Sequence, residues 1–217
     1  MVKKIRSADR RDTRSAIFQA AAVAFSSRGF DGVGVDDIAE RAQVNKAMIY
    51  YHFADKLALY RAVVADMLGT VASTATEIAE SAQPPPDKLN RFIENFVRQA
   101  DARPWFPTMM LREISEGAPH LDLDTFALMR GVFMAFSRIL DDGAAAGTFR
   151  SVHPILAYTS IVGPLLMNVA RERMAAHPGR TQIPMFVDIP HSELVAHIQY
   201  TAAQMLRPDP SSHRRHR

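Results

Sequence analysis

Residues 35–56, VDDIAERAQVNKAMIYYHFADK, carry the pattern that decides the fold of the first part of the chain. Their apolar positions are spaced as in two short helices that meet at a tight turn: Ile38, Ala39, Ala42, Val44, Ile49 and Phe53. Ala39 is small enough to let the two helices cross closely, and Val44 and Ile49 fill the angle between them. The pattern predicts a helix-turn-helix, whose second helix has a size that fits the major groove of DNA.

The outer face of that second helix carries side chains that suit DNA. The apolar pattern leaves these residues exposed on it or just beyond it: Asn45, Lys46, Tyr50, Tyr51, His52 and Lys56. Such groups can reach phosphates and base edges. Adjacent helix positions point about 100° apart, so one of the two tyrosines should turn inward. Packing is the alternative role for each tyrosine, and capping of the helix is the alternative for His52.

The composition narrows the class of protein. A chain of 217 residues suffices for one domain, or for a small domain joined to a larger one. Cysteine is absent, which excludes disulfides and thiolate sites for zinc or for nucleophilic chemistry. The polar N-terminus and the lack of an apolar run of about 18 residues predict neither a signal peptide nor a transmembrane helix. We therefore expect a cytoplasmic protein.

Charge is distributed unevenly along the chain. Residues 1–56 carry a net charge of +3, residues 57–206 carry −3, and residues 207–217 return to +3. The start of the chain holds a cluster of basic side chains: Lys3, Lys4, Arg6, Arg10, Arg11 and Arg14. A basic N-terminal part on an acidic body favours a polyanion as the partner of that part only. A tail that merely improves solubility is the alternative.

Helical spacing recurs along the chain, and no segment sustains a period of two residues. Helices are predicted at about residues 10–28, 36–42, 46–52, 55–81, 87–102, 105–117, 122–146, 154–176 and 191–206. Asp55 suits the N-cap of the fourth of these. The sequence therefore predicts an all-α fold of about nine helices, with a three-helix head on a larger bundle. Residues 207–217 contain no apolar side chain and are expected to form a disordered basic tail.

Residues 10–60 resemble the TetR (Tet repressor) family of transcriptional regulators. The resemblance is carried, in order, by Arg28-Gly29-Phe30, Asp37-Ile38-Ala39, Val44-Asn45-Lys46-Ala47, Tyr50-Tyr51-His52-Phe53 and Lys56. It implies that residues 1–54 form a DNA-binding domain of basic arm and helix-turn-helix. It implies that residues 55–206 form a helical domain for effector binding and dimerisation. A homodimer would then read a palindromic double-stranded DNA operator.

The resemblance assigns DNA contacts to three groups of residues. Backbone N–H groups that open the recognition helix can meet a phosphate or a base edge, and this group is Asn45, Lys46 and Ala47. Tyrosine hydroxyls can bond phosphates while the rings contact a sugar or a thymine methyl group, and this group is Tyr50 and Tyr51. Basic side chains can clamp the DNA backbone, and this group is His52, Lys56, Lys3, Lys4, Arg6 and Arg14.

Two positions depart from the family's pattern. Gln43 stands at the turn position that is usually glycine, so it must tolerate a left-handed conformation at modest cost. Gly34-Val35 replaces the usual serine or threonine before the second helix, so no hydroxyl is available there for a phosphate. Asp36 is expected to supply the N-cap instead.

The last two long helices should, by the same resemblance, form a four-helix interface between two copies of the chain. The apolar residues expected there are Ile155, Ile161, Leu165, Val169, Leu194, Val195, Ile198 and Met205. Packing within a single protomer is the alternative.

Methionine and aromatic residues are concentrated in the middle of the chain. They are Trp105, Phe106, Met109, Met110, Phe126, Met129, Phe133 and Met167. Because methionine adapts to irregular volumes, these residues are candidates for an adjustable apolar pocket, with core packing as the alternative. Arg112, His120 and Tyr158 are the candidate polar contacts to an unidentified small-molecule effector. An internal salt bridge between Arg112 and Glu113 is the alternative role for that arginine.

Nothing in the sequence indicates an enzyme. The eight histidines are scattered, and neither an H-E-x-x-H pattern nor a phosphate-binding loop occurs. We expect no catalytic residue, cofactor, metal or membrane partner. The expected function is a ligand-responsive repressor that leaves its operator when a small apolar or amphipathic effector binds. The alternatives are a constitutive DNA-binding protein without an effector, and a helical small-molecule-binding protein.

Overall fold

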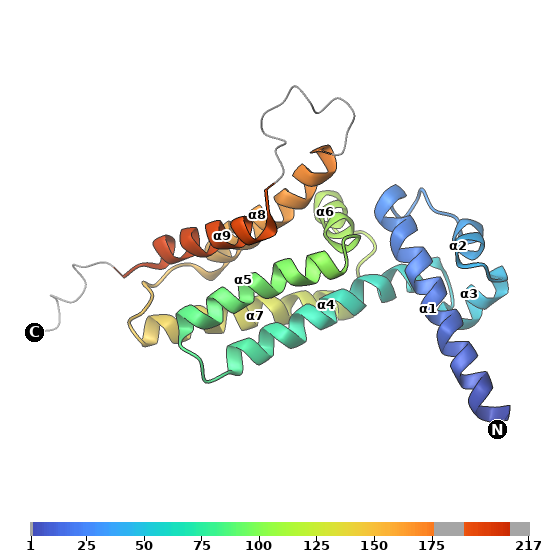
Figure 1. Ribbon diagram of the computed structural model, residues 1–217, viewed down its shortest axis with the longest axis horizontal. Helices are drawn as coiled ribbons and strands as arrows, with labels where there is room; N and C mark the ends of the chain where they lie inside the picture. Colours follow the sequence, from blue (N-terminus) through green and yellow to red (C-terminus); the bar gives the residue numbers. More distant parts are fainter. Residues whose placement is uncertain (1, 176–188, 209–217) are drawn as a thin grey trace, which may run out of the picture. The chain divides into compact units, whose positions relative to one another are not determined.

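The computed structural model describes residues 2–175 and 189–208, and the side chains of these residues except 2–11, 169, 170 and 172–175. The predicted all-α class is confirmed, because the described residues form nine α-helices and no strand (Figure 1). The helices are α1 Val2–Arg28, α2 Val35–Ala42, α3 Lys46–Phe53, α4 Lys56–Glu80, α5 Pro85–Ala102, α6 Phe106–Glu116, α7 Leu123–Ala145, α8 Pro154–Ala175 and α9 His191–Leu206.

Contacts between helices group the chain into two units. The first unit comprises Met1–Leu68 and Arg103–Phe126, and the second comprises Gly69–Ala102 and Ala127–Arg217. Helix α4 contributes its first turns to the first unit and its later turns to the second. The sequence predicted a DNA-binding domain in residues 1–54 and an effector-binding and dimerisation domain in residues 55–206. This division by function stays a prediction.

The first unit contains the predicted helix-turn-helix, packed against α1 (Figure 1). The side chains of Ile38 and Ile49 are fully buried at 0% exposure, together with Ile17 and Phe25 of α1. The two short helices have only one apolar face each, so they are held by α1 rather than by each other alone. The apolar skeleton predicted for this segment is thus confirmed at its two central positions.

The turn between α2 and α3 has the conformation expected of it. Gln43 lies in the left-handed region, with φ 55° and ψ 42°. The Val44 N–H donates to the Ala39 carbonyl over 3.0 Å, which closes the end of α2. A side chain other than glycine costs about 1 kcal/mol in such a conformation, and the closed turn tolerates that cost.

The start of α2 differs from the prediction. The Gly34 N–H donates to Oδ2 of Asp37 over 2.9 Å, so the carboxylate in the third helical position satisfies the entry to the helix. The prediction that Asp36 supplies this cap was wrong, because its carboxylate binds Lys46 instead. At the start of α4 the prediction is confirmed, since Asp55 Oδ1 accepts from the Ala58 N–H at 2.7 Å.

The basic start of the chain is helical. Helix α1 begins at Val2, about two turns before the predicted start near residue 10. The arm imagined for this segment is therefore a continuation of α1. DNA contacts were predicted for Lys3, Lys4 and Arg6 of this segment, and a dimer contact was predicted for Val169 of α8. The side chains of these four residues lie outside the described ones. Most of the predicted tail, residues 209–217, also lies outside the described part of the chain.

The second unit is a bundle in which α5 lies beside both α8 and α9 (Figure 1). Its core includes Phe92 and Phe136, whose ring centroids lie 5.2 Å apart. Lys88 is also buried, and its ammonium donates to the carbonyl of Ala79 at 2.8 Å and to Asp142 Oδ2 at 3.0 Å. A buried cation needs such partners, and these two connect the last turn of α4 to α7.

Part of the predicted dimer interface belongs to this core. Ile161, Leu165 and Ile198 are buried at 5% exposure or less within their own protomer, which favours for these three residues the alternative of packing within a single protomer. The period of 3.6 residues marks an apolar face but does not say which neighbour covers it. Ile155, which was also predicted for the interface, is exposed, and so are Leu156, Met167 and Tyr200.

Among the described residues, no helix combines the length and the apolar character that crossing a membrane requires.

Candidate nucleic-acid interface

Helix α3 presents both of its tyrosines to solvent. Tyr50 is 47% exposed and Tyr51 is 59% exposed, so the prediction that one of them turns inward was wrong. The helix is only eight residues long, and its buried contacts come from Ile49 and Phe53, which lie four residues apart on one face. Both phenol groups therefore lie on a surface that a partner can reach.

Asn45 and Ala47 shape the start of α3. The Asn45 side-chain oxygen accepts from the Ala47 N–H at 2.9 Å, which makes Asn45 the N-cap of the helix. This bond leaves the side-chain amide nitrogen of Asn45 as the group available to a base or phosphate. Ala47 is exposed and small, so its position allows another surface to approach the backbone closely.

The cations around α3 are already held by the protein. The Lys46 ammonium lies 2.8 Å from Oδ2 of Asp36, and this hydrogen bond raises the pKa of the lysine. Lys56 donates to the carbonyl of Val33 at 3.0 Å, and its ammonium lies 4.1 Å from the centroid of the Phe30 ring. The predicted clamp Lys56 thus also secures the loop that leads into α2.

Two further predicted contacts lie at the end of α3. The Arg14 guanidinium of α1 stands 4.8 Å from the centroid of the Phe53 ring. The His52 ring packs edge-on against Tyr51, with centroids 5.1 Å apart. The structure therefore brings Arg14, Tyr51 and His52 to one end of the recognition helix. Their contact with DNA stays a prediction.

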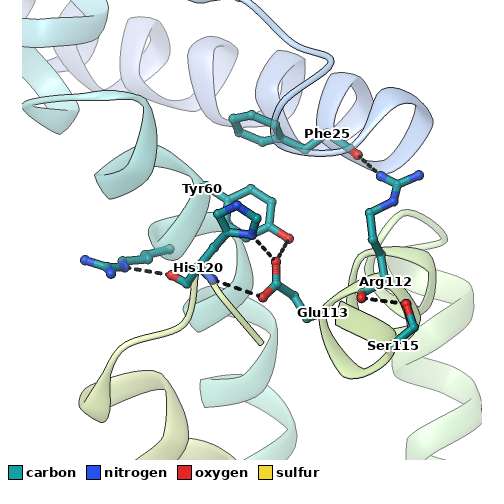
Figure 2. A network of polar contacts seen from close by, with 7 residues as sticks. Phe25, Tyr60, Arg112, Glu113, Ser115 and His120 are labelled. Carbon is teal, nitrogen blue, oxygen red and sulfur yellow. Dashed lines mark hydrogen bonds and ion pairs between the residues drawn. The ribbon is translucent and has the colours of Figure 1, made fainter. Parts of the chain in front are cut away.

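A polar network of the first unit joins α4 and α6 (Figure 2). Glu113 is 1% exposed, and its Oε1 accepts from the Tyr60 hydroxyl at 2.6 Å. The same oxygen lies 2.7 Å from Nδ1 of His120, whose backbone N–H donates to Oε2 at 3.4 Å. Arg61 donates to the His120 carbonyl at 2.8 Å. A single buried carboxylate thus joins α4, α6 and the loop before α7.

Arg112 has a separate partner from Glu113. Its guanidinium donates to the carbonyl of Phe25 at 3.2 Å, near the end of α1 (Figure 2). It also lies against Gly29, where a Cβ atom would come within 2.7 Å of it. The internal salt bridge with Glu113 that the sequence suggested does not form. Arg112 and His120 were both predicted to contact an effector. In the structure their side chains form hydrogen bonds with Phe25 and Glu113 of the first unit.

The predicted pocket residues are divided between the two units. Trp105, Phe106, Met109, Met110 and Phe126 belong to the first unit with Arg112 and His120, and Met129, Phe133, Tyr158 and Met167 belong to the second. Phe106 and both methionines of α6 are core residues at 5% exposure or less, whereas Met167 is 63% exposed. In the second unit, Phe133 and Phe136 flank Tyr158 edge-on. A ligand-binding role for these residues stays a prediction.

The ion pair between Asp36 and Lys46 was not predicted from the sequence. The two residues are ten positions apart and belong to different helices. No i, i+4 spacing within one helix announces such a pair. The only signal in the sequence was that an acidic residue lies in the first turn of α2 and a basic residue begins α3.

Two tyrosines make the stability of the protein sensitive to alkaline pH. Burial, and then the hydrogen bond to Glu113, raise the pKa of Tyr60, and burial raises the pKa of Tyr158 to about 12. Each group therefore stabilises the fold fully below its unfolded pKa of about 10, and the contribution is lost as the pH rises toward the folded value. We expect the melting temperature to fall above about pH 10. Melting curves of Tyr60→Phe and Tyr158→Phe should show a shallower decline, and an unchanged decline in both would contradict this origin.

Two family descriptions match the sequence. The description "Bacterial regulatory proteins, tetR family" matches residues 17–63. The description "Tetracyclin repressor-like, C-terminal domain" matches residues 85–178. The first match covers the helix-turn-helix, and the two together span more than half of the 217 residues.

Individual relatives share shorter stretches. The chain is 32% identical over 87 residues to the HTH-type transcriptional activator FasR of Mycolicibacterium smegmatis, which is 40% of this chain and 40% of that protein. It is 40% identical over 47 residues to the biofilm operon icaADBC negative transcriptional regulator IcaR of Staphylococcus aureus, which is 22% of this chain and 25% of that protein. The chain therefore spans less than half the length of these relatives.

A solved structure shares the fold over most of its length. The TetR family transcriptional regulator PfmR of Thermus thermophilus superimposes with a TM-score of 0.69 and 24% identity, over 87% of this chain and 97% of that one. The two sequence matches and the exposed, N-capped recognition helix lead to one conclusion. The chain belongs to the TetR family of bacterial transcriptional regulators, which are DNA-binding regulators and not enzymes.

Proposed function

We propose that this protein is a dimeric repressor that binds a palindromic operator and releases it when a small apolar or amphipathic molecule binds. The observation that carries the proposal is the surface of α3, where Tyr50 and Tyr51 are both exposed beside an N-terminus capped by Asn45. Exposed hydroxyls and the positive end of a helix are groups that bind phosphates and base edges. Repression follows if the operator overlaps a promoter.

Selection from a pool of random duplexes tests the DNA-binding part. The full-length protein should enrich one sequence with two inverted half-sites, because each protomer of a symmetric dimer reads one half. The centres of the half-sites should lie about 34–36 Å apart or a multiple of this, one helical turn of DNA. Enrichment of no common sequence would contradict a sequence-specific regulator. A reporter gene placed behind the selected site distinguishes repression from activation.

Exposed apolar side chains on the last two helices support the dimer. Leu156 and Met167 of α8 are 65% and 63% exposed, and Tyr200 of α9 is 65% exposed. Large exposed apolar groups gathered on neighbouring helices favour association with another protein surface. Because α8 and α9 lie side by side in the second unit, a second copy that presents the same pair would complete a four-helix interface.

The double variant Leu156→Glu/Tyr200→Glu should be monomeric in light scattering. A symmetric interface would bring these introduced charges into an apolar contact on both copies, and burial of an unpaired carboxylate is strongly unfavourable. The matched control is Met134→Glu, because Met134 is 58% exposed on α7 of the same unit. That control should keep the mass of the wild type. A double variant that stays dimeric would contradict this interface.

A binding site for the effector is proposed around Tyr158. Its ring packs edge-on against the rings of Phe133 and Phe136, and no hydrogen bond to its hydroxyl is found among the described residues. An apolar wall with one available hydroxyl suits an amphipathic ligand. A thermal-shift screen of small amphipathic metabolites should find compounds that raise the melting temperature and release the selected operator. Compounds that stabilise the protein without weakening DNA binding would contradict an effector role.

A further inference from the structure

The ammonium of Lys46 is held by a carboxylate at the surface predicted to face DNA. Lys46 is the first residue of α3, and its Nζ lies 2.8 Å from Oδ2 of Asp36 in the first turn of α2. The two side chains are 46% and 78% exposed, so a large anion can reach the pair. The hydrogen bond from Lys46 to Asp36 raises the pKa of the lysine.

The capping of α2 does not require Asp36. The entry to that helix is satisfied by Asp37, which accepts from the Gly34 N–H at 2.9 Å and pairs with Arg28 at 3.0 Å. Among the described residues, Lys46 is the hydrogen-bonding partner of the Asp36 carboxylate. Removal of the Asp36 charge should therefore leave the fold intact, and its main consequence should concern Lys46.

We propose that Asp36 is a positioning residue that restrains Lys46 and thereby weakens phosphate-driven binding of the protein to DNA of arbitrary sequence. The inference rests on the proposed DNA-binding function. A phosphate competes with the Asp36 carboxylate for the Lys46 ammonium. The carboxylate also lies beside any phosphate that approaches Lys46 and repels it. Both effects act on any duplex, because neither depends on base sequence.

The test measures binding of the full-length protein to a fluorescent duplex of arbitrary sequence, between about 50 and about 200 mM salt. Asp36→Asn should bind roughly twofold to fivefold more tightly, the range expected when a competing exposed ion pair is removed. The plot of log K against log salt should steepen by about 0.9, because Lys46 now neutralises one more phosphate. Asp36→Glu, which can rebuild the pair, should bind like the wild type.

Two matched variants test whether the effect of Asp36→Asn comes from the release of Lys46 or only from the loss of one negative charge. Glu40→Gln makes the same change of charge on the same face of α2, one turn further on, and Glu40 is exposed without contacting Lys46. It should leave the salt slope unchanged. Lys46→Gln should abolish the gain, so that Asp36→Asn/Lys46→Gln binds no more tightly than Lys46→Gln alone. Circular dichroism melting confirms that every variant is folded.

The outcomes distinguish the inference from the function on which it rests. A wild type that binds no duplex at any salt concentration overturns the proposed function and the restraint together. A wild type that binds DNA, with Asp36→Asn equal to it in affinity and slope, overturns the restraint alone. The restraint is also overturned if the gain persists in the Lys46→Gln background or is matched by Glu40→Gln. A gain that needs both Lys46 and the loss of the Asp36 charge supports it.

Discussion

Replacement of Glu113 by alanine should lower the free energy of unfolding by about 3–5 kcal/mol. The carboxylate is 1% exposed and accepts from the Tyr60 hydroxyl at 2.6 Å and from the His120 backbone N–H at 3.4 Å. Its loss leaves polar groups of two neighbours without a partner in a buried site, and each such group costs about 1–3 kcal/mol. The space left by the shortened side chain adds a cavity.

Urea unfolding of the full-length protein measures this change. Glu113→Gln should be milder than Glu113→Ala, because the amide fills the site and its oxygen still accepts one bond. Glu116→Ala is the matched control, since Glu116 is an exposed glutamate of the same helix, and a surface change of this kind stays within about 0.5 kcal/mol. A Glu113→Ala variant as stable as the Glu116→Ala control would show that the network contributes little to the fold.

Replacement of Gly143 by alanine should also destabilise the protein, by about 1–3 kcal/mol. In an exposed helix the same substitution would be favourable by about 1 kcal/mol, because alanine is the better helix former. At Gly143, however, a Cβ atom would overlap the ring of Phe149. The ring is buried at 7% exposure, and the Phe149 N–H donates to the Gly143 carbonyl at 3.0 Å. The ring therefore has little freedom to move, and the clash outweighs helix propensity.

Gly131→Ala is the matched control for this prediction. Gly131 lies on the same helix, α7, and a Cβ atom there would meet Ala72 at an ordinary contact distance of 3.6 Å. This variant should be as stable as the wild type or more stable. The second control is Gly143→Ala/Phe149→Leu, which removes the ring and should recover part of the loss relative to Phe149→Leu. Equal effects of alanine at both glycines would contradict the packing explanation.

Most helix boundaries were predictable from the sequence because their signals are local, with the start of α1 as the exception. Asp55 caps α4 as predicted, through the Ala58 N–H, and Gln43 adopts the left-handed turn that its position required. Caps, turns and apolar periodicity depend on residues within about one or two helical turns of one another. A single sequence therefore sufficed for the order, type and approximate length of the helices.

The candidate site was predictable only in part. The exposure predicted for the outer face of the recognition helix is confirmed for Tyr50 and Tyr51, and Asn45 and Lys46 lie at the start of α3, whereas the contact of these residues with DNA stays a prediction. The sequence did not predict that neither tyrosine turns inward, nor did it predict the hydrogen-bonding partner of Lys46. Both tyrosines are exposed, and Lys46 is paired with Asp36. Helical periodicity indicates the face of the helix on which a side chain lies, but it does not indicate which residue of another helix contacts that side chain.

The sequence by itself determined that the described part of this chain is helical, the order and approximate bounds of its helices apart from the start of α1, and that residues 35–56 form a helix-turn-helix. Only the tertiary structure decided that Glu113 joins Tyr60 and His120, and that Ile161 and Ile198 belong to the protomer's core. The reason is the range of the interactions. Tyr60 and Glu113 are 53 residues apart, and contacts over such a distance depend on how all the intervening helices pack. A local sequence pattern therefore does not predict which two distant residues will contact each other.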